Sequence, residues 1–182
     1  MNKRLYLEIF QELWKEESYY KECYLNKQTP DPQKMVELTS NLVFPLERGI
    51  EVRKHPCFLP EYLHTHDFLE ICYVVSGSAK HLIFDNIIEQ KEGEFLFLPP
   101  SVYHTIGVFD NSVVINILVN KMIITELVES FCLLDSPLAS FFSTISSEKP
   151  KVLKLNSAIN EDNDTLVYLL AKKYKTNSSN EI

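Results

Sequence analysis

Three histidines and one glutamate form the most informative pattern in the sequence. His64, His66 and Glu70 share parity within H-T-H-D-F-L-E, and His104 closes the later segment G-E-F-L-F-L-P-P-S-V-Y-H. Because successive side chains of a strand alternate between its faces, the first three would point to one side of a sheet. Converging imidazoles and a carboxylate would suit a divalent transition metal, such as Zn, Ni, Fe or Mn, or the polar floor of a small-ligand site.

The spacing of these residues resembles the two motifs of the cupin family. Residues that match the first motif, G-x5-H-x-H-x3,4-E-x6-G, are His64, His66, Glu70 and Gly77. Residues that match the second, G-x5-P-x-G-x2-H-x3-N, are Gly93, Pro99 and His104. Phe58, Ser101 and Val108 stand where the motifs have Gly, Gly and Asn. The resemblance covers roughly residues 58–120 and implies a cupin-like antiparallel β-barrel of the jelly-roll type, with all four metal-ligand positions of the family filled.

A longer stretch resembles the N-terminal effector-binding domain of AraC-type transcriptional regulators. It runs from H-T-H-D-F-L-E-I-C-Y-V-V-S-G-S-A to S-V-V-I-N-I-L-V-N. Members of that family carry a cupin sensor followed by a C-terminal domain with two helix-turn-helix units. The resemblance implies a domain that binds a small-molecule effector in the barrel lumen and dimerises through the helices after the barrel. It also implies contact with DNA only through a helix-turn-helix domain, which we expect to be missing from a chain that ends at Ile182.

Strand parity and position extend the candidate effector site beyond the motif residues. Phe68 and Cys72 share the parity of Glu70, and Tyr62 and Tyr103 flank the two motifs near strand ends. The effector-binding candidates are therefore Tyr62, His64, His66, Phe68, Glu70, Cys72, Tyr103 and His104. Core packing is the alternative for Phe68 and Cys72, and either tyrosine could bridge core and solvent. His64, His66, Glu70 and His104 are the metal-ligand candidates, and a hydrogen-bonded polar cluster that anchors strands or touches an organic effector is the alternative.

Composition narrows the classes of function. A net charge of −7 argues against nucleic-acid binding by this segment, because phosphate contacts need clustered Lys and Arg. The N-terminus lacks the apolar stretch of a signal peptide, and no run is long enough to cross a bilayer, so we expect a cytoplasmic protein without a membrane partner. With no P-loop, nucleophile elbow or dinucleotide fingerprint, we expect a binding domain that needs no cofactor and is not an enzyme. A stand-alone metal-dependent cupin enzyme, of dioxygenase or isomerase type, is the alternative.

Hydrophobic periodicity predicts a mainly β fold with added helices. Residues 4–25 read as an amphipathic helix, about eight short strands follow between 42 and 120, and helical spacing returns from Lys121. Residues 152–155 are either a short strand or a connector, and a last helix is expected over about 161–175. Its predicted apolar stripe is Leu166, Val167, Leu170 and Tyr174. We therefore divide the chain into an N-terminal helical segment (1–40), the cupin barrel (41–120) and a helical dimerisation or linker region (121–182).

Overall fold

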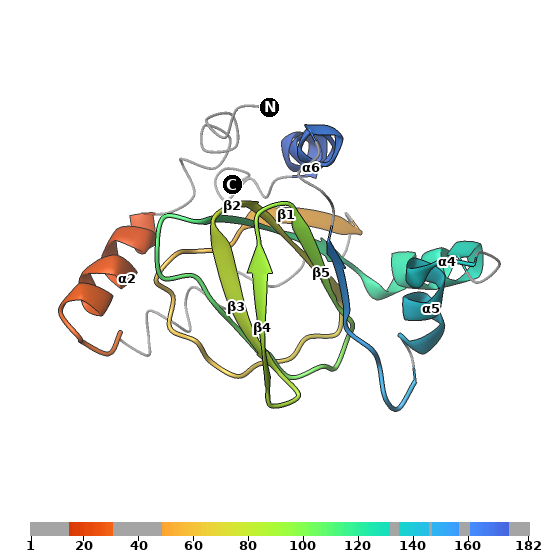
Figure 1. Ribbon diagram of the computed structural model, residues 1–182, viewed down its shortest axis with the longest axis horizontal. Helices are drawn as coiled ribbons and strands as arrows, with labels where there is room; N and C mark the ends of the chain where they lie inside the picture. The colour runs from red at the N-terminus through yellow and green to blue at the C-terminus, as the bar shows by residue number, and fades with distance from the viewer. Residues whose placement is uncertain (1–14, 31–48, 132–134, 146, 157–160, 175–182) are drawn as a thin grey trace, which may run out of the picture.

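Tight turns divide the strand-forming region into short antiparallel strands. Gly77 and Gly93 have positive φ angles between consecutive strands. Phe84 and Asp85 both have positive φ, as a two-residue type I′ hairpin turn requires. The computed structural model describes residues 15–30, 49–131, 135–145, 147–156 and 161–174 (Figure 1). The strands are β1 (Ile50–Lys54), β2 (Leu69–Ser76), β3 (Ser78–Ile83), β4 (Asn86–Lys91), β5 (Glu94–Leu98), β6 (His104–Gly107), β7 (Val113–Val119) and β8 (Leu153–Asn156).

The strands form two antiparallel sheets, which confirms the predicted cupin-like, mainly β fold class. One sheet has five strands in the order β1-β7-β2-β5-β8, and the other has three in the order β4-β3-β6. The described part of the segment predicted to hold about eight strands contains seven. The eighth, β8, comes from the segment left open as strand or connector, where Phe95 of β5 pairs with Leu155. The unpaired backbone groups at the edge of β5 explain this addition, because an edge strand offers hydrogen bonds to any extended segment.

The five-stranded sheet is buried on both faces. One apolar cluster lies between the two sheets and includes Cys72, Val74, Leu96 and Val114. The second lies on the opposite face of the same strands, beneath the helices. All seven residues of β7 are buried, which explains why its sequence is a nearly continuous apolar run. The first cluster shares its compartment with the polar residues described below.

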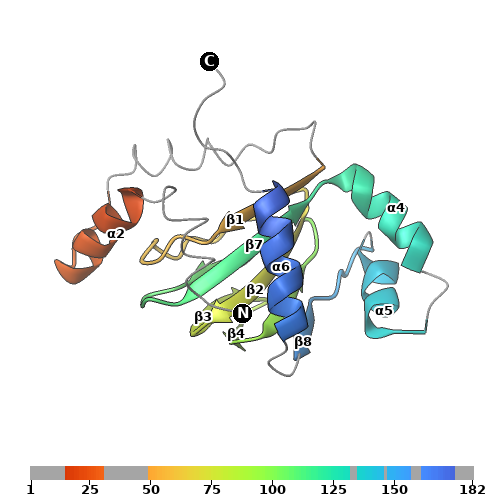
Figure 2. The ribbon, with the colours of Figure 1, turned by 90° about the horizontal axis from the view of Figure 1, so that it is seen from above.

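Helices cover one face of the larger sheet and both ends of the molecule. They are α2 (Lys15–Leu25), α4 (Lys121–Phe131), α5 (Pro137–Thr144) and α6 (Glu161–Tyr174). Figure 1 places α2 at the opposite end of the sheets from α4 and α5, and Figure 2 shows α6 lying across the sheet. The Ser136 hydroxyl caps α5 by accepting a hydrogen bond from the Ala139 amide, with Pro137 in the first turn. The part of the predicted 4–25 helix before Lys15 lies outside the described residues.

The apolar stripe of α6 differs from the prediction at one position. Val167 and Ala171 are buried against the sheet, and Leu170 and Tyr174 pack beside them. Leu166, however, is 56% exposed. Positions 167, 171 and 174 follow the spacing of one helix face, whereas 166 lies about 100° away from 167, so Leu166 points outward. The Tyr73 hydroxyl fixes the helix further by donating a hydrogen bond of 2.5 Å to Asp164 Oδ1.

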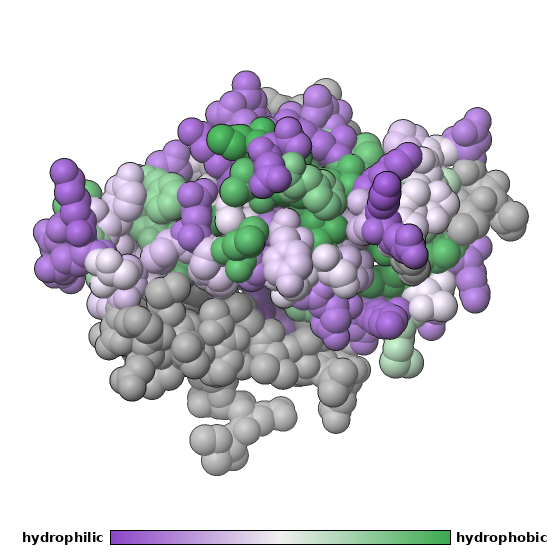
Figure 3. All heavy atoms as spheres, turned by 90° about the horizontal axis from the view of Figure 1, so that it is seen from below, coloured by the Kyte–Doolittle hydropathy of each residue, from purple (hydrophilic) through white to green (hydrophobic). Residues whose placement is uncertain are grey.

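The described part of the face shown in Figure 3 is mixed in polarity. On the face shown in Figure 3, hydrophobic residues form small groups separated by hydrophilic ones. This agrees with the burial of most large apolar side chains in the two clusters. Within the described segments, no helix is both long and apolar enough to span a bilayer.

At two positions where the sequence departs from the cupin motifs, the backbone still has the left-handed conformation that glycine favours. Phe58 and Ser101 stand at motif glycine positions, and their φ angles are 62° and 65°. The left-handed region costs an L-residue roughly 1–2 kcal/mol, whereas glycine enters it freely. The fold therefore tolerates local backbone strain at both positions.

We expect Ser101→Gly to stabilise the fold. Ser101 is exposed, so the substitution removes the strain at little cost in packing. After allowance for the greater freedom of glycine in the unfolded chain, the gain should be about 0.5–1 kcal/mol in urea unfolding. Ser140→Gly, at an exposed position inside α5, is the matched control and should lower stability by about 0.5 kcal/mol. A loss of stability in Ser101→Gly would contradict the strain argument.

Candidate functional site

Backbone pairing brings the two motifs together. His64 and His104 form an isolated antiparallel bridge, in which each backbone amide donates to the carbonyl oxygen of the other residue at 3.1 and 3.0 Å. The Ser101 amide also donates to the His66 carbonyl at 2.8 Å. Glu70 lies near the start of β2, between Leu98 of β5 and Leu118 of β7. The sheet therefore presents the Glu70 carboxylate to histidines that arrive on separate segments.

Glu70 is the centre of the site. Its residue is only 5% exposed, and its Oε1 accepts a hydrogen bond of 2.6 Å from Asn116 Nδ2. Its Oε2 lies 3.0 Å from His66 Nε2 and 3.3 Å from His104 Nε2. Burial alone would raise the pKa of Glu70, but the hydrogen bonds and positive charge of these two imidazoles hold it well below its usual value. The carboxylate is therefore ionised inside the fold.

Each of the three motif histidines is oriented by a backbone carbonyl. The Nδ1 atoms of His64, His66 and His104 lie 3.0, 2.8 and 3.1 Å from the carbonyl oxygens of Tyr62, Phe68 and Val102. A carbonyl can only accept, so each Nδ1 carries a proton. Nε2 is consequently the atom that each ring offers to other partners. This is the arrangement that orients histidine ligands in metal sites.

Three of the four predicted ligands can meet at one ion. One ligand atom from each of His64, Glu70 and His104 lies within 4.8 Å of the others. His66 lies outside this group, with its ring stacked on Phe68 at 4.1 Å between centroids and its Nε2 on Glu70. Two imidazoles and one carboxylate fit a divalent transition metal that keeps open positions. These three residues would hold such an ion, which would act as a Lewis acid when bound.

The pKa values of the two histidines in this group shift in opposite directions. Burial lowers the pKa of His64. At His104 burial also opposes the charged form, but the hydrogen bond and charge of Glu70 outweigh it and raise the pKa. The pair can thus hold one neutral and one protonated ring beside the carboxylate.

The remaining predicted effector residues lie at different depths. Tyr62 is half-buried, with its ring 5.0 Å from that of His64. Phe68 is also half-buried, against His66. Cys72 is fully buried in the apolar cluster between the sheets, where burial and the charge of Glu70 raise its thiol pKa well above the usual value. Tyr103 is 61% exposed, on the surface beside the site. Their roles in effector binding stay predictions.

Two buried histidines and two amides extend the site beyond the sequence prediction. Gln90 donates both amide hydrogens, to the carbonyls of Cys72 (2.9 Å) and Glu94 (2.7 Å), so its Oε1 must accept from His81 Nε2 at 3.0 Å. His81 Nδ1 is therefore an unprotonated acceptor when the ring is neutral. It is buried and has no hydrogen-bond partner among the described residues. The same holds for His55 Nε2 and Asn116 Oδ1.

All five histidines of the chain interact electrostatically with the single carboxylate of Glu70. The alternation of side chains along β3 could have predicted that His81 points inward, because His81 shares the parity of the buried residues Ala79 and Ile83. No sequence motif pointed to His55, which follows β1 and donates its backbone amide to Val114.

The fold and this site define a ligand-binding domain of the cupin type, and comparison with known families gives a specific assignment. The model of the AraC-like ligand binding domain matches residues 44–138, more than half of the chain. The chain therefore belongs to the AraC-like ligand-binding domain family, as its motifs indicated. Among curated proteins there is no match.

Several solved structures are similar at low identity. Protein NMB1881 from Neisseria meningitidis is 23% identical over 41% of this chain and 77% of its own, with a TM-score of 0.34. ToxT from Vibrio cholerae, in a structure with a bound unsaturated fatty acid, is 15% identical over 69% of this chain and 46% of its own, with a TM-score of 0.47. A cupin protein from Bacteroides fragilis is 23% identical over 40% of this chain and 64% of its own, with a TM-score of 0.33. The chain thus spans less than half the length of ToxT.

The buried histidines predict how stability depends on pH. Burial lowers the pKa of His55 to about 3 and that of His81 to about 4, from 6.5 in the unfolded chain. The unfolded state therefore binds more protons below pH 6.5, and the free energy of unfolding should fall by about 1.4 kcal/mol per pH unit for each histidine as the pH drops toward 4. His81→Gln should remove one such contribution from urea unfolding measured between pH 6.5 and 4.

Lys80→Gln is the matched control, because Lys80 is exposed on the opposite face of β3 from His81. Its pH dependence should equal that of the wild type. An unchanged pH dependence in His81→Gln would show that His81 titrates alike in the folded and unfolded states.

Proposed function

We propose that the chain is the sensing domain of an AraC-type transcriptional regulator and binds a small-molecule effector between its two sheets. The observation that carries this proposal is a set of buried polar atoms around Glu70 that have no hydrogen-bond partner among the described residues: His55 Nε2, His81 Nδ1 and Asn116 Oδ1. Leaving such an atom unsatisfied costs about 1–3 kcal/mol, so this interior is poorly suited to stability alone. A ligand that supplies the missing hydrogen bonds would recover that cost. A DNA-binding domain outside these residues would respond to it.

The polar atoms indicate which chemistry the effector carries. His81 Nδ1 in the neutral ring and Asn116 Oδ1 are acceptors, and Glu70 is an ionised carboxylate. An effector with hydroxyl or amine donors would complement them. An effector that presents only acceptors would leave them unpaired.

A metal-dependent cupin enzyme, of dioxygenase or isomerase type, is the second candidate. The grouping of His64, Glu70 and His104 favours it, since two histidines and a carboxylate leave coordination positions open to a substrate. We prefer a domain that does not catalyse a reaction, because Glu70 would be a metal ligand and His81, with its pKa lowered to about 4, is a weak general base.

Elemental analysis of protein purified without an affinity tag distinguishes the two candidates. For a sensor without a resident metal we expect a folded, metal-free protein whose Tm does not change with a chelator, because no ligand that stabilises the folded state is removed. A stoichiometric transition metal that is lost in His104→Ala would instead support the enzyme. Tyr103→Ala, at the exposed neighbouring position, is the control and should behave as the wild type.

We also propose that the domain dimerises through the outer face of α6. Leu166 and Leu169 are 56% and 55% exposed on this helix, whose opposite face packs on the sheet. A second copy would bury both, and a two-fold pair would match paired DNA half-sites. In sedimentation at tens of micromolar, we expect the wild type to dimerise and Leu166→Glu to be monomeric.

Ile87→Glu is the matched control for dimerisation, because Ile87 is 77% exposed on β4, away from α6. It should leave the association constant unchanged. A wild-type monomer at every concentration would rule the dimer out.

A further inference from the structure

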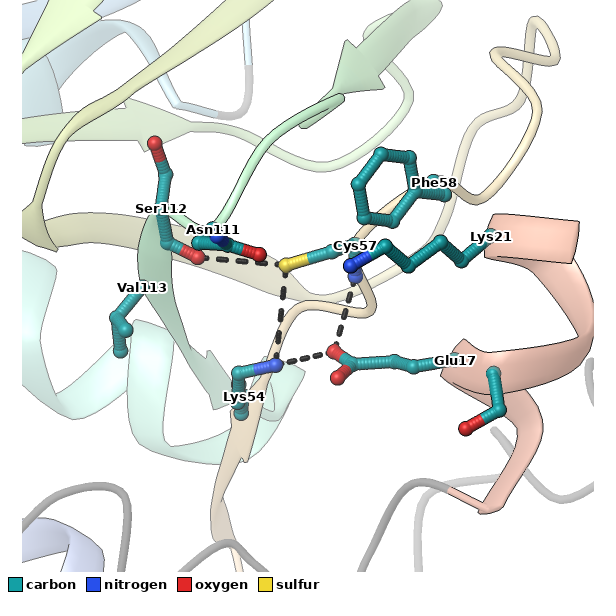
Figure 4. Close-up of a pocket in the computed structure, with 9 residues that line it drawn as sticks. Glu17, Lys21, Lys54, Cys57, Phe58, Asn111, Ser112 and Val113 are labelled. Atoms are coloured by element: carbon teal, nitrogen blue, oxygen red, sulfur yellow. Dashed lines mark hydrogen bonds and ion pairs between the residues drawn. The ribbon is translucent and has the colours of Figure 1, made fainter. Parts of the chain in front are cut away.

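A cavity lies at the other end of the molecule from α4 and α5, between α2 and the end of the sheets. Its volume is about 300 Å³, and its lining includes Glu17, Lys21, Lys54, Cys57, Phe58 and Ser112. None of these residues belongs to the histidine cluster. Figure 4 shows them converging from α2, from the end of β1 and the segment after it, and from the segment before β7.

The sheets present an anion-binding position to this cavity, and a side chain of α2 fills it. Glu17 Oε1 accepts hydrogen bonds from the Lys54 ammonium and from the Cys57 amide, the latter at 3.0 Å (Figure 4). Lys54 is only 6% exposed, so its charge is costly unless an anion pairs with it. A carboxylate is thus already seen in this position, supplied by the chain itself.

Charge and polarity around the cavity favour a small monoanion. The lining holds two lysines and one glutamate, a local excess of one positive charge in a chain whose net charge is −7. Burial raises the pKa of Cys57 to about 11, so its thiol is neutral and donates to the Ser112 carbonyl at 3.3 Å. The nearby Asp110 carboxylate accepts from the Ser112 amide at 2.8 Å. Of these two carboxylates, Glu17 and Asp110, Glu17 is therefore the one that contacts Lys54.

Apolar surface lies beside the charged position. Phe58 and Val113 line the same cavity, and the Lys21 ammonium lies 5.4 Å from the centre of the Phe58 ring. A cavity of this size lies at the small end of the range for organic ligands. A carboxylate head with a short apolar or aromatic body would therefore match both parts of the lining.

We propose that this cavity is a second ligand site, which takes a small monocarboxylate whose carboxylate replaces that of Glu17 on Lys54 and the Cys57 amide. Other contacts hold α2 in place while Glu17 moves aside. Tyr20 and Cys23 of α2 are buried, and the Tyr24 ring stacks on Phe109 at 5.2 Å between centroids. Ligand binding then exchanges one carboxylate for another without undocking the helix.

Calorimetric titration of residues 1–182 with benzoate tests the proposal. Glu17→Gln should bind benzoate at least about tenfold more tightly than the wild type, because a site that its own side chain occupies most of the time binds more weakly by the free fraction. Lys21→Gln, at an exposed position, should weaken binding, and Lys54→Gln should abolish it. An increase in affinity cannot arise from misfolding, so Glu17→Gln remains informative even if Lys54→Gln does not fold.

Controls separate this site from the histidine cluster and from nonspecific anion binding. His104→Ala should bind benzoate as the wild type does, whatever it does to the interior site. Glu22→Gln, at an exposed position on the same helix, should leave affinity unchanged. Equal affinity in Glu17→Gln and wild type, or inorganic phosphate binding as tightly as benzoate, would overturn the proposal.

Discussion

The arrangement of the interior depends on one buried carboxylate. Glu70 is ionised at 5% exposure, and a charge in that position persists only if donors surround it. Asn116, His66 and His104 provide them, and the backbone carbonyls beside the histidines fix the ring orientations in turn. Each segment that carries a donor must therefore return to β2. Two backbone pairings bring these segments to β2: the bridge between His64 and His104, and the pairing of β7 with β2.

Strand β2 also connects the interior to the helical face. Glu70 and Cys72 point between the sheets, whereas Tyr73 points the other way and donates to Asp164 of α6. Because consecutive residues of one strand are rigidly linked, a change in packing around Glu70 has a short physical route to the helix that we propose as the dimer contact. The cavity beneath α2 lies away from this route and depends on Lys54 instead.

Local patterns predicted most of the fold and the centre of the site. The H-x-H-x3-E spacing and the second motif identified Glu70 and its three histidines, and periodicity located α4, α5 and α6. His81, Gln90 and Asn116 were not predicted, because their role depends on which strands face one another, and register is a non-local property. The pairing of β8 with β5 and the outward position of Leu166 depend on tertiary packing in the same way.

The titration of His104, followed by NMR of its ring nitrogens, tests the central claim most directly. If Glu70 organises the interior, the pKa of His104 lies above 6.5 in the wild type, because the carboxylate outweighs burial. In Glu70→Gln burial is opposed only by the hydrogen bond to the Val102 carbonyl, which has the smaller effect, so the pKa should fall below 6.5. Glu89→Gln, on the exposed part of β4, should leave it unchanged. The same pKa for His104 in wild type and Glu70→Gln would contradict the account.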